Sequence, residues 1–130
     1  MVRNMKLKSR KYGNKKVERN GVKFDSELEL ACHDIIKSFG FEFEFQKKIV
    51  LVDKFRYNSE SIRAITMIVD FVVYHNGITA YVDSKGFGTE VSKIKYKMLK
   101  NQLKEEQNTQ VVWLHSKKEA LEFFDNLKKK

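Results

Sequence analysis

The sequence predicts a single α/β domain built on a mixed sheet, and three observations lead to this class. The chain has 130 residues, 42% of them hydrophobic, which suits one compact domain with its own core. Two runs rich in β-branched and aromatic residues, 63–75 and 78–85, are separated only by Asn76-Gly77. This dipeptide is a strong hairpin signal because both positions of a type I′ turn need a positive φ. A helical pattern then leads to a short apolar run at 110–114, and a strand–helix–strand connection normally joins parallel strands by a right-handed crossover.

The N-terminal residues carry almost all of the positive excess. Residues 1–20 read as a flexible basic arm, and residues 21–130 as the domain. Nine basic residues and one acidic residue lie in residues 1–23, which accounts for +8 of the formal charge of +9. Such an arm is typical of nucleic-acid binding, with Lys11, Lys15 and Lys16 as candidate DNA contacts. A merely solubilising tail or a contact with an anionic membrane surface are the alternatives, but the arm lacks an amphipathic apolar stripe.

The first helix and the first strand follow the arm. Ser26 can cap the helix, and Glu29, three residues later, can complete a capping box. Apolar residues recur at helical spacing from there until Gly40 ends the pattern. Strict alternation in residues 41–45, continued by the apolar run 49–52, predicts the first strand.

The second half of the chain supplies the remaining elements. Residues 53–62 read as a polar connection to the two hairpin strands. Thr89 can cap a long helix whose core-facing positions we expect to be Val91, Ile94, Met98 and Leu99. The short strand at 110–114 and a helix capped by Ser116 and running through Leu127 complete the chain. The predicted order is therefore helix, three strands, helix, strand and helix, with the first three strands forming an antiparallel meander.

The hairpin register brings charged side chains together. A two-residue turn pairs His75 with Ile78, so Asp70 falls directly opposite Asp83, and Lys85 shares a face with Asp83. Opposed like charges destabilise a sheet, and a hard divalent cation such as Mg²⁺ would relieve the repulsion. The alternative is a solvated strand end with Lys85 as a simple counter-ion. Because Asp70 is embedded in an apolar run, we favour a functional site.

Composition also limits the cellular compartment and the partners that we expect for the protein. No run of about 18 apolar residues exists, and the basic N-terminus lacks the apolar region of a signal peptide, so we expect no membrane partner. A single cysteine, Cys32, excludes an internal disulfide and fits the reducing cytoplasm. We expect it to be a small buried hydrophobic residue rather than a nucleophile. The three histidines show no zinc-ligand spacing.

Four stretches of the chain carry a resemblance to a known family. They are Lys11-Tyr-Gly-Asn-Lys-Lys16, Phe24-Asp-Ser-Glu-Leu-Glu29, Arg63-Ala-Ile-Thr-Met-Ile-Val-Asp-Phe71 and Asp83-Ser-Lys-Gly-Phe-Gly-Thr89. Over about residues 11–115 the sequence resembles small phage and prophage nuclease-like proteins of the PD-(D/E)xK superfamily. In layout it is also similar to phage-type junction-resolving endonucleases. The resemblance implies a restriction-endonuclease-like αβββαβ core with a C-terminal helix, in a phage- or prophage-encoded protein acting in the cytoplasm of a bacterial host.

The same resemblance implies a chemistry and a set of residues. It points to a Mg²⁺- or Mn²⁺-dependent endonuclease that hydrolyses DNA phosphodiester bonds, with Holliday junctions or other branched recombination intermediates as substrates and a homodimer as the expected assembly. Asp70 and Asp83 map to the metal ligands, and we add the Ser84 backbone carbonyl as a further oxygen. Lys85 maps to the lysine that orients the attacking water or neutralises transition-state charge. Glu29 maps to the helix carboxylate, and Glu27 is the competing choice.

The superfamily pattern is not matched at every position. Val69 stands where the proline of the pattern would be, and Asp83 replaces the more frequent glutamate. The aspartate keeps the ligand type on a shorter side chain.

Several further assignments stay open at this level. Glu29 would serve equally well as a plain capping residue. Lys93 and Lys97, one helical turn apart, could contact phosphate or simply form a solvated face. Gln46 could reach the site or be an ordinary edge residue. The break at Gly86-Phe87-Gly88 could admit a DNA backbone or be only a tight turn.

The rival functions are a non-catalytic nucleic-acid-binding module on a nuclease fold and a phage accessory protein that binds a host protein.

Overall fold

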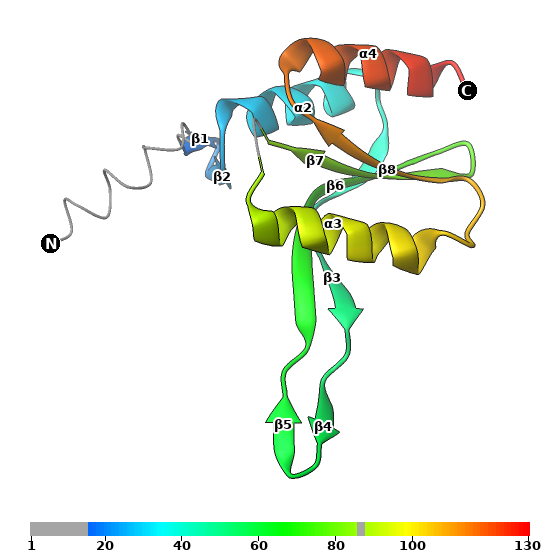
Figure 1. The fold of residues 1–130 in the computed structure, drawn as a ribbon. Helices are drawn as coiled ribbons and strands as arrows, with labels where there is room; N and C mark the ends of the chain where they lie inside the picture. Colours follow the sequence, from blue (N-terminus) through cyan, green and yellow to red (C-terminus); the bar gives the residue numbers. More distant parts are fainter. Residues whose placement is uncertain (1–15, 86–87) are drawn as a thin grey trace, which may run out of the picture.

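A four-stranded mixed sheet forms the centre of the computed structural model, which describes residues 16–85 and 88–130 (Figure 1). Its strands lie in the order β3-β6-β7-β8, with the pairs β3/β6 and β6/β7 antiparallel and the pair β7/β8 parallel. The strands are β3 (Glu42–Val52), β6 (Ile65–His75), β7 (Ile78–Ser84) and β8 (Thr109–Leu114). The antiparallel meander and the parallel last pair confirm the predicted topology.

Three helices cover the sheet on its two faces. They are α2 (Glu27–Ser38), α3 (Glu90–Leu103) and α4 (Lys117–Lys128). Helices α2 and α4 pack on one face, and α3, which connects β7 to β8, packs on the other (Figure 1). Ser26, Thr89 and Ser116 cap them as predicted, each accepting a hydrogen bond from the backbone N–H three residues later.

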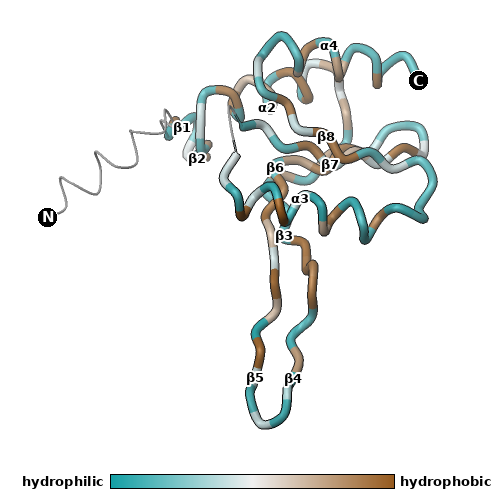
Figure 2. The backbone as a smooth tube through the Cα atoms, viewed as in Figure 1, coloured by the Kyte–Doolittle hydropathy of each residue, from teal (hydrophilic) through white to brown (hydrophobic). Residues whose placement is uncertain are grey.

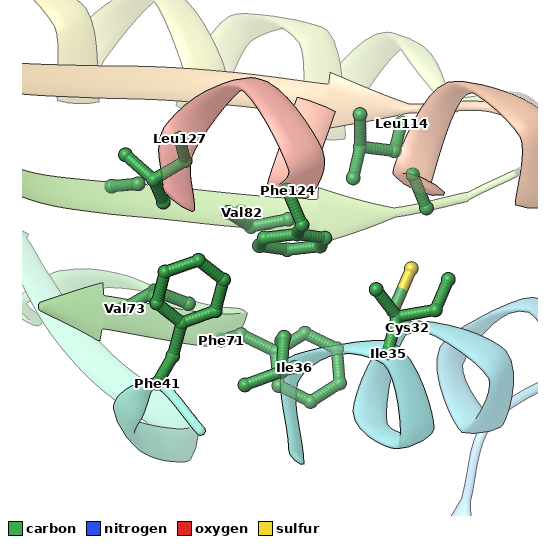
Figure 3. Packing of buried hydrophobic residues seen from close by; sticks show 12 residues of the cluster. Cys32, Ile35, Ile36, Phe41, Phe71, Val73, Val82, Leu114, Phe124 and Leu127 are labelled. Carbon is green, nitrogen blue, oxygen red and sulfur yellow. The ribbon is translucent and has the colours of Figure 1, made fainter. Parts of the chain in front are cut away.

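The larger core cluster lies between the sheet and the α2/α4 layer. Phe71 and Val82, paired on neighbouring strands, contact side chains of both helices, including Ile36 and Phe124 (Figure 3). All four are almost completely buried. Since burying a large apolar side chain contributes about 1.5–3 kcal/mol, this cluster is a major source of the stability that holds the site in place.

The hairpin has the predicted register. Asn76 and Gly77 take φ values of 49° and 78°, and the pairs run from His75↔Ile78 to Phe71↔Val82. The next pair along would be Asp70 with Asp83, and the regular ladder stops there.

The side chains of β3 and β6 change faces at this same level. In β6, Met67 and Val69 point toward α3, whereas Phe71, two residues further, belongs to the α2/α4 cluster. On β3 the change falls at Gln46, which has a φ of 53° and interrupts the pairing opposite Asp70. Strict alternation would keep odd-numbered residues on one face, so both strands rotate together at Gln46 and Asp70.

Helix α3 buries only part of the stripe that was predicted. Leu99 is buried as expected and Met98 is half-buried, but Val91 and Ile94, also expected in the core, are 60% and 55% exposed. Tyr96 and Leu103 are buried in their place. The helix has two apolar stripes, and packing selects the one that contains Tyr96. The Tyr96 hydroxyl donates a 2.6 Å hydrogen bond to the Val112 carbonyl, a bond that hydrophobicity alone does not indicate.

The connection predicted at residues 53–62 is instead a hairpin at the end of a projecting arm. β4 (Phe55–Tyr57) pairs with β5 (Glu60–Ile62) beyond the ends of β3 and β6. The outer ends of β3 and β6 and the hairpin of β4 and β5 project together from the body of the molecule (Figure 1). Figure 2 shows polar and apolar residues mixed along this projection. We call residues 47–69 the β-arm.

A small hairpin also lies within the region predicted to be a flexible arm. β1 (Val17–Arg19) pairs with β2 (Val22–Phe24), and Arg19 makes a 2.8 Å ion pair with Asp34 of α2. Ordered structure therefore begins before residue 21. Of the predicted DNA contacts nearby, Lys16 is exposed, and Lys11 and Lys15 lie outside the described residues.

Over residues 16–85 and 88–130, no helix has the length and apolar character needed to span a membrane.

Candidate functional site

Asp70 on β6 and Asp83 on β7 each accept a hydrogen bond from a backbone N–H of the neighbouring strand, at the point where the hairpin ladder ends. The Asp70 N–H donates to Oδ1 of Asp83 at 3.1 Å, and the Ser84 N–H donates to Oδ2 of Asp70 at 2.8 Å. Carboxylates thus take the place that backbone carbonyls hold elsewhere in the ladder. Both side chains are buried, so the two carboxyl groups are held next to each other away from solvent.

Ser84 acts as a double donor to Asp70. Besides its N–H, its hydroxyl donates to the same Oδ2 at 3.0 Å, and Ser84 is itself buried. These contacts use the N–H and the hydroxyl of Ser84, whereas the predicted metal contact uses its carbonyl oxygen. Two donors on one oxygen hold the Asp70 carboxyl group in place and fix the direction of its other oxygen.

Glu29 enters the site from the first turn of α2, and its two oxygens have separate environments. Oε1 accepts a 2.6 Å hydrogen bond from the Asp25 N–H, which satisfies one donor at the helix end. Oε2 is buried and has no hydrogen-bond partner. Glu29 is only 1% exposed, whereas Glu27 is on the surface, so the structure places Glu29 and not its competitor at the site. Glu29 thus makes the capping contact through Oε1 alone, and Oε2 remains available for a role at the site.

Glu119 at the start of α4 shows what capping alone looks like. It occupies the same helical position and accepts from the His115 N–H at 2.9 Å. Its carboxylate is exposed, and the hydrogen bond from the His115 backbone lowers its pKa. A helix cap therefore does not require the burial seen at Glu29, and the cost of that burial calls for another explanation.

The electrostatics of the buried carboxyl groups follow from burial and mutual repulsion. Burial, and then the neighbouring Asp70 carboxylate, raise the pKa of Glu29 to about 8. The same two causes raise the pKa of Asp83 to about 7, and the Lys85 ammonium acts in the opposite direction. At neutral pH the site therefore holds more acidic groups than it can ionise without added positive charge.

Three carboxylates converge closely enough to hold one cation. Asp25, Glu29 and Asp70 each offer an oxygen, and these three atoms lie within 4.8 Å of one another. Asp25 is exposed and was not anticipated; the only signal for it is its position directly before the Ser26 cap, which brings it back over the first turn of α2.

Of the predicted metal ligands, Asp70 belongs to the three-carboxylate cluster, and Asp83 adjoins it through the N–H bond described above. Burial raises the pKa of Tyr96 on α3, and the nearby Asp83 carboxylate adds to this effect. Hairpin pairing placed Asp83 correctly beside Asp70, and the resemblance indicated Glu29, but neither indicated Asp25.

Lys85 is held at the site by its backbone. Its N–H donates to the Leu114 carbonyl at 3.1 Å, and its carbonyl accepts from Nε1 of Trp113 at 3.0 Å. In the part of the chain that the structure describes, its ammonium makes no ion pair within 4.0 Å. Lys85 thus has a fixed position and a side chain free to meet an anionic ligand.

An aromatic stack supports this segment and was missed by sequence reasoning. Trp113 is sandwiched between Tyr96 and His115, with ring centroids 5.0 and 5.4 Å away. A Cβ on Gly88 would lie 1.9 Å from the Trp113 ring, so only glycine fits there. Gly86 and Phe87 lie outside the described residues.

The remaining predicted residues lie outside the carboxylate cluster. Lys93 and Lys97 are exposed on α3. Gln46 is also exposed and lies across from Asp70, where the β3/β6 pairing is interrupted. Cys32 is fully buried as predicted, and burial raises the pKa of its thiol to about 12, so it stays protonated and unreactive.

Comparison with known proteins gives a family but no relative of established activity. Neither the characterised proteins nor the solved structures contain a match to the chain. A family model covers residues 9–129, nearly the whole sequence. The chain therefore belongs to the family described as "Protein of unknown function (DUF1064)".

Proposed function

We propose that this protein is a divalent-metal-dependent endonuclease that hydrolyses DNA phosphodiester bonds. The observation that carries the proposal is Glu29, a buried carboxyl group whose Oε2 has no partner beside the Asp70 carboxylate. Leaving a buried polar atom unpaired costs about 1–3 kcal/mol, and packing carboxylates together adds repulsion. A bound cation would remove both costs.

The donor set fits a hard cation. Carboxylate oxygens are the ligands that Mg²⁺ and Mn²⁺ take in proteins, usually with waters and phosphate oxygens completing the shell. Asp25, Glu29 and Asp70 would hold the ion, with Asp83 beside Asp70 available for it or for a second one. Such an ion supplies charge relief at the phosphoryl centre and an activated water.

The chain's own groups would then position the substrate. Ser84 orients the Asp70 carboxylate by donating two hydrogen bonds to it. Lys85, with its backbone clamped by Trp113 and Leu114, would place an ammonium near the scissile phosphate, to orient the attacking water or to neutralise charge. Lys93 and Lys97 would contact the DNA backbone, and the basic residues before β1 would add salt-dependent affinity. Cutting two strands of a branched DNA needs two such sites, so a homodimer is part of the proposal.

Cleavage assays test the proposal directly. We expect the full chain to cut supercoiled plasmid or a synthetic four-way junction with Mg²⁺ or Mn²⁺, and EDTA to stop the reaction. Asp70→Asn and Lys85→Ala should each lower the rate at least 100-fold, because each removes a group of the site. Asp125→Asn, an exposed carboxylate change on α4, is the matched control and should leave the rate unchanged.

Two results would count against this function. Cleavage that persists in Asp70→Asn would remove the site assignment. Tight DNA binding without cleavage under any divalent metal would favour the non-catalytic binding module instead.

A further inference from the structure

We propose that the β-arm is a DNA-binding element whose tip stacks on unpaired bases of the DNA that lies across the candidate site. The inference rests on the proposed function in one respect, namely that DNA is the partner. It adds a specific contact surface and a preference for DNA with unpaired bases. Three independent features of the arm support it.

The first feature is position. The β-arm ends at Val69, so its base adjoins Asp70 of the candidate site directly along β6. At about 3.3 Å per residue, the five steps from Asp70 back to Ile65 already span about 17 Å, and β4 and β5 extend the arm further (Figure 1). A nucleic acid lying across the site would therefore meet the arm.

The second feature is charge. Residues 47–69 contain five basic and two acidic residues, whereas residues 24–46 and 70–130 together contain 12 basic and 14 acidic ones. The positive excess of the body thus lies in the arm, where it complements a polyanion. Near the tip, Arg56 donates one hydrogen bond to the Ser59 carbonyl at 2.9 Å, which holds its guanidinium in place while its other N–H groups remain for phosphate.

The third feature is a pair of exposed aromatic rings at the tip. Phe55 and Tyr57, 49% and 65% exposed, alternate with Arg56 on β4 and so project from the same face. Exposed rings add little to the stability of a hairpin. Aromatic rings among cationic side chains are, however, the usual platform on which unpaired bases stack.

A groove links this arm to the predicted DNA contacts on α3. An open hollow of about 470 Å³ lies between Leu51 and Val52 of the arm and Lys97 and Asn101 of α3. A DNA strand that contacts Lys97 is therefore already beside the arm. This continuity favours DNA over a second copy of the chain as the occupant.

Binding measurements on the full chain test the inference. Fluorescence anisotropy in EDTA would compare a single strand, a duplex and a four-way junction of the same sequence. The double variant Phe55→Ala/Tyr57→Ala should bind the single strand and the junction at least tenfold more weakly, and the duplex less than threefold more weakly. Leu121→Ala, an exposed apolar change on α4, should bind all three like the wild type.

A charge variant gives an independent readout. Lys54→Ala/Arg56→Ala should lower the slope of log affinity against log salt for the single strand by about 1.4, because each phosphate contact contributes about 0.7. Thermal unfolding of each variant should match that of the wild type, since the substituted side chains are exposed at the tip of the arm.

The possible outcomes distinguish a failure of the β-arm inference from a failure of the nuclease proposal. Wild-type affinities in both arm variants would overturn the inference, even if the wild type cleaves DNA. Loss of dimer in sedimentation with unchanged DNA affinity would also overturn it, by making the arm a self-association surface. Weakened binding by the arm variants, with no cleavage by the wild type, would support the arm and contradict the nuclease.

Discussion

Glu29 and Glu119 are the same residue in the same helical position, yet their surroundings give them different chemistry. Both accept a hydrogen bond from the backbone N–H four residues earlier. Glu119 faces solvent and its pKa is lowered by that bond. Burial and the Asp70 carboxylate raise the pKa of Glu29 instead, to about 8. The site's chemistry thus depends on what lies beyond the cap.

The raised pKa values predict how stability depends on pH. Glu29 titrates near 4.5 when unfolded and about 8 when folded, and Asp83 shifts in the same direction. Between these pKa values the folded protein retains protons that the unfolded chain releases. The free energy of unfolding of the metal-free protein should therefore fall as pH rises from about 5 to 8. Glu29→Gln should reduce this fall by about 1–3 kcal/mol, measured by urea unfolding at several pH values.

Metal and a matched variant provide the controls. Saturating Mg²⁺ should raise the Tm of the wild type more at pH 8 than at pH 6, because ions bind the deprotonated carboxylates. Glu119→Gln should leave the pH profile between 5 and 8 unchanged. A profile in Glu29→Gln identical to that of the wild type would refute the assigned environment of Glu29.

At the scale of elements, the junction between β7 and α3 decides where Lys85 lies. Gly88 allows Trp113 to lie against the backbone, and Trp113 in turn holds the Lys85 carbonyl. Tyr96 stacks on the other side of Trp113 and bonds to β8. The helix, both parallel strands and the lysine are therefore coupled through one ring.

Gly88→Ala should disturb this coupling. The added methyl meets the Trp113 ring, and overpacking of this kind costs about 1–3 kcal/mol. Urea unfolding would measure the loss, together with a lower cleavage rate if Lys85 shifts. Adding Trp113→Phe should recover part of the stability in a double-mutant cycle, and strictly additive losses would show that the ring and the glycine do not interact.

At the scale of the whole molecule, charge is divided between two separate regions. The residues before β2 carry most of the net positive charge of the full chain. Within residues 24–130, the excess of basic over acidic residues lies in the β-arm. The site lies beside the base of the β-arm. DNA held by these regions would be drawn to the carboxylates only when a metal offsets their charge.

The N-terminal lysines should contribute affinity without specificity. Lys11→Ala/Lys15→Ala/Lys16→Ala should weaken binding to all DNA forms alike and lower the salt slope for duplex by about 2.7, at about 0.9 per contact. Anisotropy titrations at several salt concentrations would measure this. A change confined to one DNA form would show instead that these lysines recognise DNA structure.

Sequence alone determined the features that depend on neighbouring residues. The Asn76-Gly77 turn set the hairpin register and so placed Asp70 beside Asp83, and the capping residues set the starts of the helices. Only the tertiary structure decided that Asp25 joins Glu29 and Asp70, that β3 and β6 switch faces at that level, and that α3 buries the stripe containing Tyr96. These features arise where segments far apart in the chain pack together, and packing chooses among patterns that are locally equivalent.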